Sequence, residues 1–126
     1  MQWPDLTSVL NDTPFAVVGA VATRLYAPER STRDLDIAVS FDNSNAVREK
    51  MRQAGWHLSG ELTIGGSSWR SAAGEEVDIL EVHEVWWTQA IAQAQTNRDA
   101  QGLPILPLPY LALMKFQSSR ATTSRT

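Results

Sequence analysis

The sequence predicts an α/β (α+β) fold in which a small mixed β-sheet is flanked by helices. Short apolar or alternating runs, typical of strands, are interleaved with segments of helical periodicity. The chain has 126 residues, which suits one domain around a single hydrophobic core. It has no cysteine, which excludes a thiolate nucleophile, a zinc ribbon and a disulfide framework.

The N-terminal third is expected to contain two helices and one strand. Pro4 suits the first position of a helix, and the apolar residues after it share one helical face. Residues 15–18 form an apolar run before Gly19, which is typical of a buried strand that ends in a tight turn. Residues 20–27 are expected to be helical and to stop before Pro28.

The middle third is expected to begin with a strand that has one apolar and one polar face. Over residues 34–40, Leu, Ile and Val alternate with smaller or charged residues, two of which are aspartates. A helix over residues 46–54 follows, with Asp42 or Ser44 as its expected N-cap and Gly55 at its end.

The remaining expected elements are a hairpin, a strand and two helices. The hairpin joins residues 56–64 to residues 68–71 around a Gly-Gly turn. Residues 77–80 are typical of a second buried strand. Helical periodicity predicts one helix over residues 86–94 and another that starts at Pro107 or Pro109.

We expect one domain over residues 1–116 and a polar tail over residues 117–126. The chain shows no secretory signal, and no apolar run approaches the ~20 residues of a membrane span, so a cytoplasmic protein without a membrane partner is expected. Its net charge of −3 argues against general nucleic-acid binding. Basic residues gather over residues 24–33 and 100–126, which suits a compact polyphosphate, with ordinary solvated arginines as the alternative.

The first candidate for a chemical site is the pair Asp34 and Asp36. Residues two apart on a strand point to the same side and lie about 6.6 Å apart. Two carboxylates on one face suit Mg²⁺, which prefers oxygen ligands. With seven aspartates among 126 residues, about 0.4 Asp-x-Asp pairs are expected by chance, so the pair alone is a weak signal. The alternative is that both aspartates lie on a solvated strand face and bind no metal.

Two other features raise the interest of this pair. Asp78 is the lone carboxylate of a strand-like apolar run, where burial costs several kcal/mol unless the carboxylate binds something charged. A metal shared with the aspartate pair would account for it, and a solvated strand face is again the alternative. Gly19-Ala20, between a strand and a helix, would offer backbone N–H groups to a phosphate, although a plain turn also explains it.

Taken together, these segments resemble the nucleotidyltransferase superfamily of DNA polymerase beta. The resemblance is carried by Val18-Gly19-Ala20, by the string Arg30-Ser31-Thr32-Arg33-Asp34-Leu35-Asp36-Ile37, and by Asp78 about forty residues on. It is closest to the small bacterial branch that contains abortive-infection-type toxins, where an Arg-x-Thr-x-Asp-hydrophobic-Asp string is usual. It covers residues 15–82 well and extends more faintly to residues 103–120.

The resemblance implies a nucleotidyltransferase fold and a magnesium-dependent transfer of a nucleotide from an NTP to an acceptor hydroxyl, on RNA or protein. It implies that Asp34, Asp36 and Asp78 are the catalytic residues and hold the metal, with two Mg²⁺ ions when NTP is bound. The residues that it implies for holding the nucleotide are Gly19, Ala20, Arg30, Thr32 and Lys115.

Two departures from the family pattern keep a second hypothesis open. The family's turn is commonly Gly-Ser or Gly-Gly, whereas Ala20 has no hydroxyl to offer a phosphate. The toxin branch usually has an acid shortly after its late basic residues, whereas nothing acidic follows Asp99. Either the chain is truncated, or it is a catalytically degenerate nucleotide-binding or interaction module of the same fold.

The five tryptophans suggest a third hypothesis, an interaction protein whose carboxylates are merely solvated. Trp86 and Trp87 cannot both face one core from a helix, so one of them is expected at a partner or base-stacking surface. With the short polar tail, this predicts a homodimer or a helical partner protein. The sequence names neither the NTP nor the acceptor.

Overall fold

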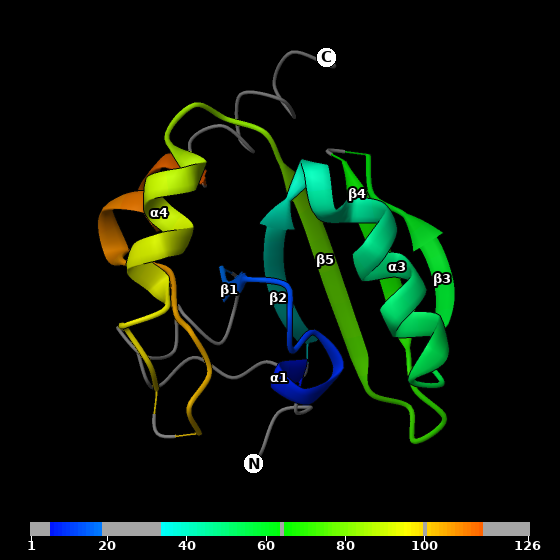
Figure 1. Ribbon diagram of the computed structural model, residues 1–126. Coiled ribbons are helices and arrows are strands. Elements are labelled where there is room, and N and C mark those ends of the chain that lie inside the picture. The colour runs from blue at the N-terminus through cyan, green and yellow to red at the C-terminus, as the bar shows by residue number, and fades with distance from the viewer. Residues whose placement is uncertain (1–5, 19–33, 64, 100, 115–126) are drawn as a thin grey trace.

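Two parallel strands form the centre of the sheet. The computed structural model describes residues 6–18, 34–63, 65–99 and 101–114. Within them, the sheet has the strand order β1-β2-β5-β4-β3, with β2 parallel to β5 and the other neighbours antiparallel (Figure 1). The strands are β1 (Phe15–Val17), β2 (Asp34–Ser40), β3 (His57–Glu61), β4 (Gly66–Arg70) and β5 (Glu76–Val82). The small mixed sheet that the sequence predicts is confirmed.

Helices pack on both faces of this sheet. The short helix α1 (Leu6–Val9) and the longer α3 (Ser44–Gln53), which follows the 3-10 turn η1 (Phe41–Asn43), contribute to one core cluster. The helix α4 (Trp87–Ala94) and a helix over residues 108–114 belong to the other, and α4 lies beside β1 and β2 in Figure 1. None of the helices in the described residues has the length and the hydrophobicity to cross a bilayer.

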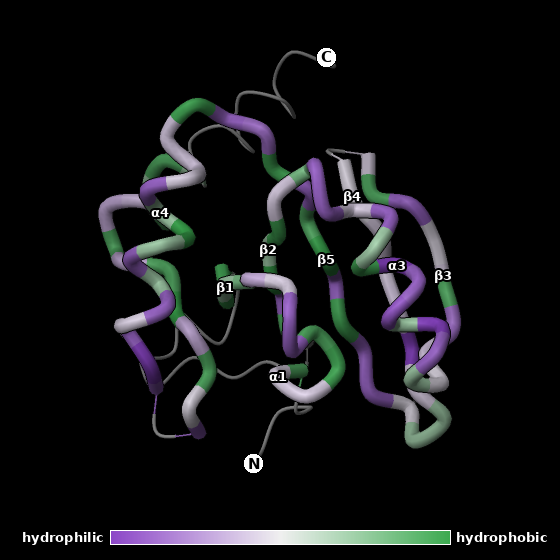
Figure 2. Tube along the Cα trace, in the orientation of Figure 1, coloured by the Kyte–Doolittle hydropathy of each residue, from purple (hydrophilic) through white to green (hydrophobic). Residues whose placement is uncertain are grey.

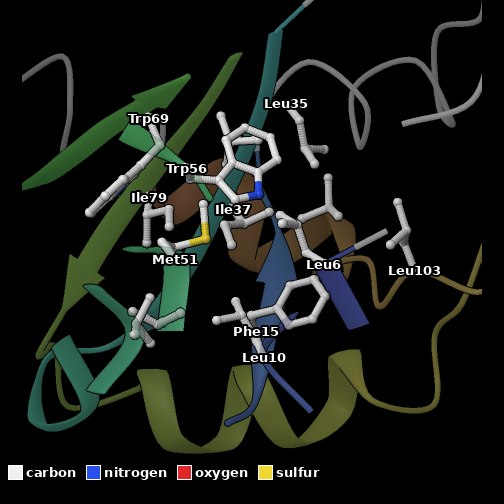
Figure 3. Close-up of a cluster of buried hydrophobic side chains, with 14 of the residues drawn as sticks. Leu6, Leu10, Phe15, Leu35, Ile37, Met51, Trp56, Trp69, Ile79 and Leu103 are labelled. Atoms are coloured by element: carbon white, nitrogen blue, oxygen red, sulfur yellow. The ribbon is translucent and has the colours of Figure 1, made fainter. Parts of the chain in front are cut away.

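The larger core lies between the sheet and helices α1 and α3. The inward residues of β2 are Leu35, Ile37 and Val39, all fully buried, so the predicted alternation of this strand is confirmed. Side chains from α1, α3 and the strands meet there, among them Met51 and Trp69 (Figure 3). Burying a side chain such as Leu35 or Ile37 contributes about 1.5–3 kcal/mol, so the core on this face contributes much of the free energy that stabilises the fold.

The opposite face of the sheet is only partly covered by an apolar layer. Ala16, Ala38 and Val82 pack there with the buried side of α4, which presents Trp87 and Ile91 among others. In β5, polar and apolar residues alternate from Glu76 to Ile79, as Figure 2 shows. Leu80 is apolar and packs against the layer on the second face, whereas the residues before it on that face, Glu76 and Asp78, are acidic.

The predicted start of α3 needs correction. The N-cap of α3 is Asn43 rather than Asp42 or Ser44, and no side chain caps the helix. The 3-10 turn η1 runs directly into α3, and the backbone N–H of Ser44 bonds to the carbonyl of Phe41, so the helix begins without a side-chain cap. The helix predicted over residues 20–27 lies outside the described residues.

Arg48 joins three elements through its guanidinium. It lies on α3, donates from Nε to Glu81 of β5 at 2.9 Å, and donates two 2.9 Å hydrogen bonds to Glu61 of β3. Glu81 is only 8% exposed and Arg48 21%, whereas Glu61 is well exposed. The hydrogen bonds from Arg48 lower the pKa of Glu61, and those to Glu61 and Glu81 raise the pKa of Arg48. This ion triad fixes α3 to the sheet.

We predict that Arg48→Met lowers the free energy of unfolding by about 2 kcal/mol at neutral pH, because it leaves the Glu81 carboxylate buried without its cation. Adding Glu81→Gln to this variant should restore part of the loss. Since the folded pKa of Glu61 is lowered, the stability from its pair is complete above the ordinary glutamate pKa of about 4.3 and is lost as pH falls through the folded value. Urea unfolding should therefore show the gap between wild type and Arg48→Met narrowing in acid. A constant gap, or a further loss on adding Glu81→Gln, would contradict this role.

Gly66 allows a close approach between β4 and β5. Its φ is +142°, and a Cβ added there would lie 2.1 Å from the carbonyl oxygen of Ile79. No side chain fits at that distance without moving the backbone of the central sheet. The Gly-Gly pair that marks the predicted hairpin therefore serves the sheet as well as the turn, because Gly66 is the first residue of β4.

We predict that Gly66→Ala destabilises the fold by more than about 2 kcal/mol, since the unfavourable φ alone costs on the order of 1–3 kcal/mol. Gly60→Ala is the matched control, because a Cβ at Gly60 meets no atom within 4 Å and its φ is ordinary. Thermal unfolding followed by circular dichroism should show a large loss for the first variant and a small change for the second. Equal melting temperatures for the two variants would show that the close contact is absent in solution.

Candidate functional site

The register of the two central strands brings Asp36 and Asp78 together. In the parallel pair, Asp36 is the partner of Asp78, and Asp34 is the partner of Glu76. The neighbours of Asp78 in β5, Val77 and Ile79, point into the main core. Both aspartates therefore point to the opposite face, from adjacent strands about 4.8 Å apart. Each is half-buried.

This pair marks the boundary of the apolar layer on the second face. The next residues along the same face are Ala38 in β2 and Leu80 in β5, and both contact the layer under α4. At the far end of β2, the indole N–H of Trp87 donates to Ser40 at 3.1 Å, which fixes α4 over that end. The aspartates thus lie one step beyond the apolar layer along their strands.

Ser68 lies on the other flank of Asp78. It is the β4 partner of Asp78, and its hydroxyl donates to Oδ1 of that carboxylate at 2.5 Å. This length lies at the short end of the range for a hydrogen bond between two oxygen atoms. The sheet order places β5 between β2 and β4, so Asp36 and Ser68 flank Asp78 from opposite sides.

One step further along β4, Arg70 adds positive charge to the same face. Its guanidinium pairs with Glu76 of β5, and both side chains are substantially exposed. Glu76 is the register partner of Asp34. Among the described residues of the five strands, Arg70 is the one cation on this face of the sheet. A charge in this position can stabilise an anionic ligand near the aspartates.

The residue that follows β1, Val18, lies beside Asp36. The backbone N–H of Val18 donates to the carbonyl of Asp36 at 2.9 Å. Gly19 follows Val18 in the chain, but it lies outside the described residues. The other predicted nucleotide-binding residues outside this part are Ala20, Arg30, Thr32 and Lys115. The backbone of Asp34 belongs to β2, while its side chain is also outside the description.

The donor set at this point suits a hard divalent cation. Asp36 and Asp78 supply carboxylate oxygens from adjacent registered positions, the ligand type that Mg²⁺ prefers. Among the described side chains, no group of three acids or histidines forms a complete metal site. Asp34 is the predicted third carboxylate, two residues before Asp36 on the same strand. The described residues fit a shared magnesium site as two of its predicted ligands.

Sequence reasoning missed both Ser68 and Arg70. It assigned this stretch to a hairpin, and nothing in a Gly-Gly-Ser-Ser-Trp-Arg run tells which strand it pairs with or in which register. The alternation after Gly66 does show that Ser68 and Arg70 share a face. Only the pairing with β5 shows that this face carries Asp78.

The two tryptophans at the start of α4 differ in burial. Trp87 is buried in the second core. Trp86 is half-buried, and its ring stacks on Tyr110 with the centroids 5.9 Å apart. Trp87 is thus the core indole, whereas Trp86 keeps partial exposure, and a partner or base-stacking surface at Trp86 stays a prediction.

A separate hollow of about 250 Å³ lies at the other end of β1. Its lining includes Phe15, Asp12 and Arg98. Phe15 is paired with Val39, three residues along β2 from Asp36, so this hollow does not coincide with the aspartate pair.

Comparison with known proteins supports the fold. No family model matches this sequence, and no curated protein sequence does. Among solved structures, the chain is similar to the crystal structure of a "putative nucleotidyltransferase" from Thermotoga maritima, with a TM-score of 0.66 and 12% sequence identity. The match covers 95% of this chain and 86% of that one. At this identity the likeness establishes the shared fold, a mixed sheet with flanking helices, as the sequence predicts.

Proposed function

We propose that this protein is a magnesium-dependent nucleotidyltransferase, which moves an NMP from an NTP to an acceptor hydroxyl with pyrophosphate as the leaving group. The observation that carries the proposal is the register of β2 and β5, which pairs Asp36 with Asp78 on one face of the sheet. The string before Asp36 and the fold shared with a "putative nucleotidyltransferase" support the same reading.

Each side chain has a role that its position supports. Asp36 and Asp34, two residues apart on β2, would hold Mg²⁺, which neutralises charge on the triphosphate when bound. Asp78 would complete the site and accept the proton of the attacking hydroxyl at its carboxylate. Arg70 would add positive charge near the phosphates after release from the exposed Glu76. Gly19, Ala20, Arg30, Thr32 and Lys115 keep the nucleotide-binding roles that the resemblance implies.

We propose RNA or protein as the acceptor, following the resemblance to toxin-type members of the superfamily. A homodimer or a helical partner protein belongs to the same proposal. Because Ala20 lacks the hydroxyl that is common at this turn, the alternative is a module that binds NTP without transferring it. Binding and transfer must therefore be measured separately.

The first test measures metal-dependent stability. We predict that Mg²⁺ with NTP raises the melting temperature of the wild type, by about 2.7 kcal/mol in stability at a hundredfold excess over the dissociation constant. Asp36→Asn should melt at the same temperature or higher without ligand, because it removes one of two neighbouring negative charges, and should lose most of the ligand response. The exposed Asp42→Asn, beyond the far end of β2, is the control and should respond like the wild type. Lowered stability of Asp36→Asn with an unchanged response to Mg²⁺ would make Asp36 a structural residue.

The second test measures transfer. We predict that the wild type, incubated with Mg²⁺ and each alpha-labelled NTP, labels an acceptor when RNA or cell extract is supplied. Asp36→Asn and Asp78→Asn should each reduce the labelling at least a hundredfold, since each removes a group that acts in the reaction. NTP-dependent stabilisation without label transfer would support the non-transferring module, and the absence of both would exclude the proposed function.

A further inference from the structure

Ser68 and Ser67 are adjacent in β4 but point to opposite faces of the sheet. Ser67 is fully buried and accepts a 2.7 Å hydrogen bond from the indole N–H of Trp69, in the main core. Ser68 is half-buried and donates its hydroxyl to Asp78 at 2.5 Å on the second face. One serine therefore satisfies a core tryptophan, and the other contacts a carboxylate of the candidate site.

The contact restricts how the Asp78 carboxylate can turn. The second side-chain torsion of an aspartate is broad and roughly two-fold, so an unsupported carboxylate samples many orientations. A short hydrogen bond to Oδ1 selects one of them and leaves Oδ2 outside this bond. The bond comes from β4, on the flank of Asp78 that faces away from β2 and Asp36.

On the β5 side, the backbone around Ser68 is paired without interruption. Two residues earlier, Gly66 approaches the carbonyl of Ile79 so closely that no Cβ fits. On both sides of Ser68, β4 pairs in continuous register with β5 from Gly66 to Arg70. A group held on a rigid strand fixes the orientation of its neighbour better than one on a loop does.

We infer that Ser68 is a positioning residue for Asp78 in metal binding and nucleotidyl transfer. This inference rests on the proposed function. Ser68 touches neither substrate nor metal, and it acts by presenting the Asp78 carboxylate in one orientation. Outer partners of metal-binding carboxylates typically change metal affinity or activity by about 10–100-fold when they are removed.

The test compares Ser68→Ala, Ser68→Thr and Ser67→Ala with the wild type. Mn²⁺ binding is measured by calorimetry, transfer by label incorporation at saturating NTP, and folding by thermal unfolding. Ser68→Ala should bind Mn²⁺ about tenfold more weakly and transfer about tenfold more slowly, with a nearly unchanged melting temperature and KM for NTP. Ser68→Thr keeps the hydroxyl and should restore both. Ser67→Ala should instead melt lower, because it leaves the Trp69 indole unsatisfied, and should bind Mn²⁺ normally at temperatures where it is folded.

The outcomes separate this inference from the function on which it rests. A wild type that binds Mn²⁺ and transfers label while Ser68→Ala matches it would overturn the positioning role and leave the proposed function standing. A loss in Ser68→Thr as large as that in Ser68→Ala would also overturn the role, since the hydroxyl would then not matter. Label found on Ser68 itself would make it an acceptor rather than a positioning residue. A wild type with neither Mn²⁺ binding nor transfer would overturn both proposals.

Discussion

The parallel pairing of β2 with β5 is the constraint on which the rest of the structure depends. It runs from Asp34 with Glu76 to Ser40 with Val82, and it joins segments that are far apart in the chain. Parallel strands need a crossover connection, which here consists of α3 and the hairpin of β3 and β4. A shift of one residue in this register would turn Asp78 into the core and a valine or isoleucine to the opposite face. The same pairing therefore fixes the core and the candidate site together.

The two faces of the sheet hold different kinds of side chains. The first face holds the large core and the ion triad of Arg48, Glu61 and Glu81, which fixes α3 to β3 and β5. The second face has an apolar layer under α4 at one end and polar side chains at the other. The larger cluster of buried apolar side chains lies on the first face, and the neighbouring aspartates lie on the second.

The sequence predicted the elements better than the contacts between them. The strand over residues 34–40 was predictable because alternation with period two is a local property of the chain. The family resemblance led us to expect Asp36 and Asp78 close together, but the pairing that puts them on one face is a register between strands distant in sequence. The contact of Ser68 with Asp78 depends on a second register, that of β4 with β5. Nothing near Arg48 in the sequence shows that Glu81 is its buried partner, because the two residues are 33 positions apart.

The hairpin links the stability of the sheet to the geometry of the candidate site. Gly66 allows β4 to approach β5 at Ile79, and two residues further along β4 the same pairing places Ser68 against Asp78. If β4 and β5 moved apart at Gly66, we would expect Ser68 and Asp78 to shift relative to each other, although Gly66 has no side chain to contact either of them. The Gly65-Gly66 pair thus affects the candidate site through the packing of β4 on β5.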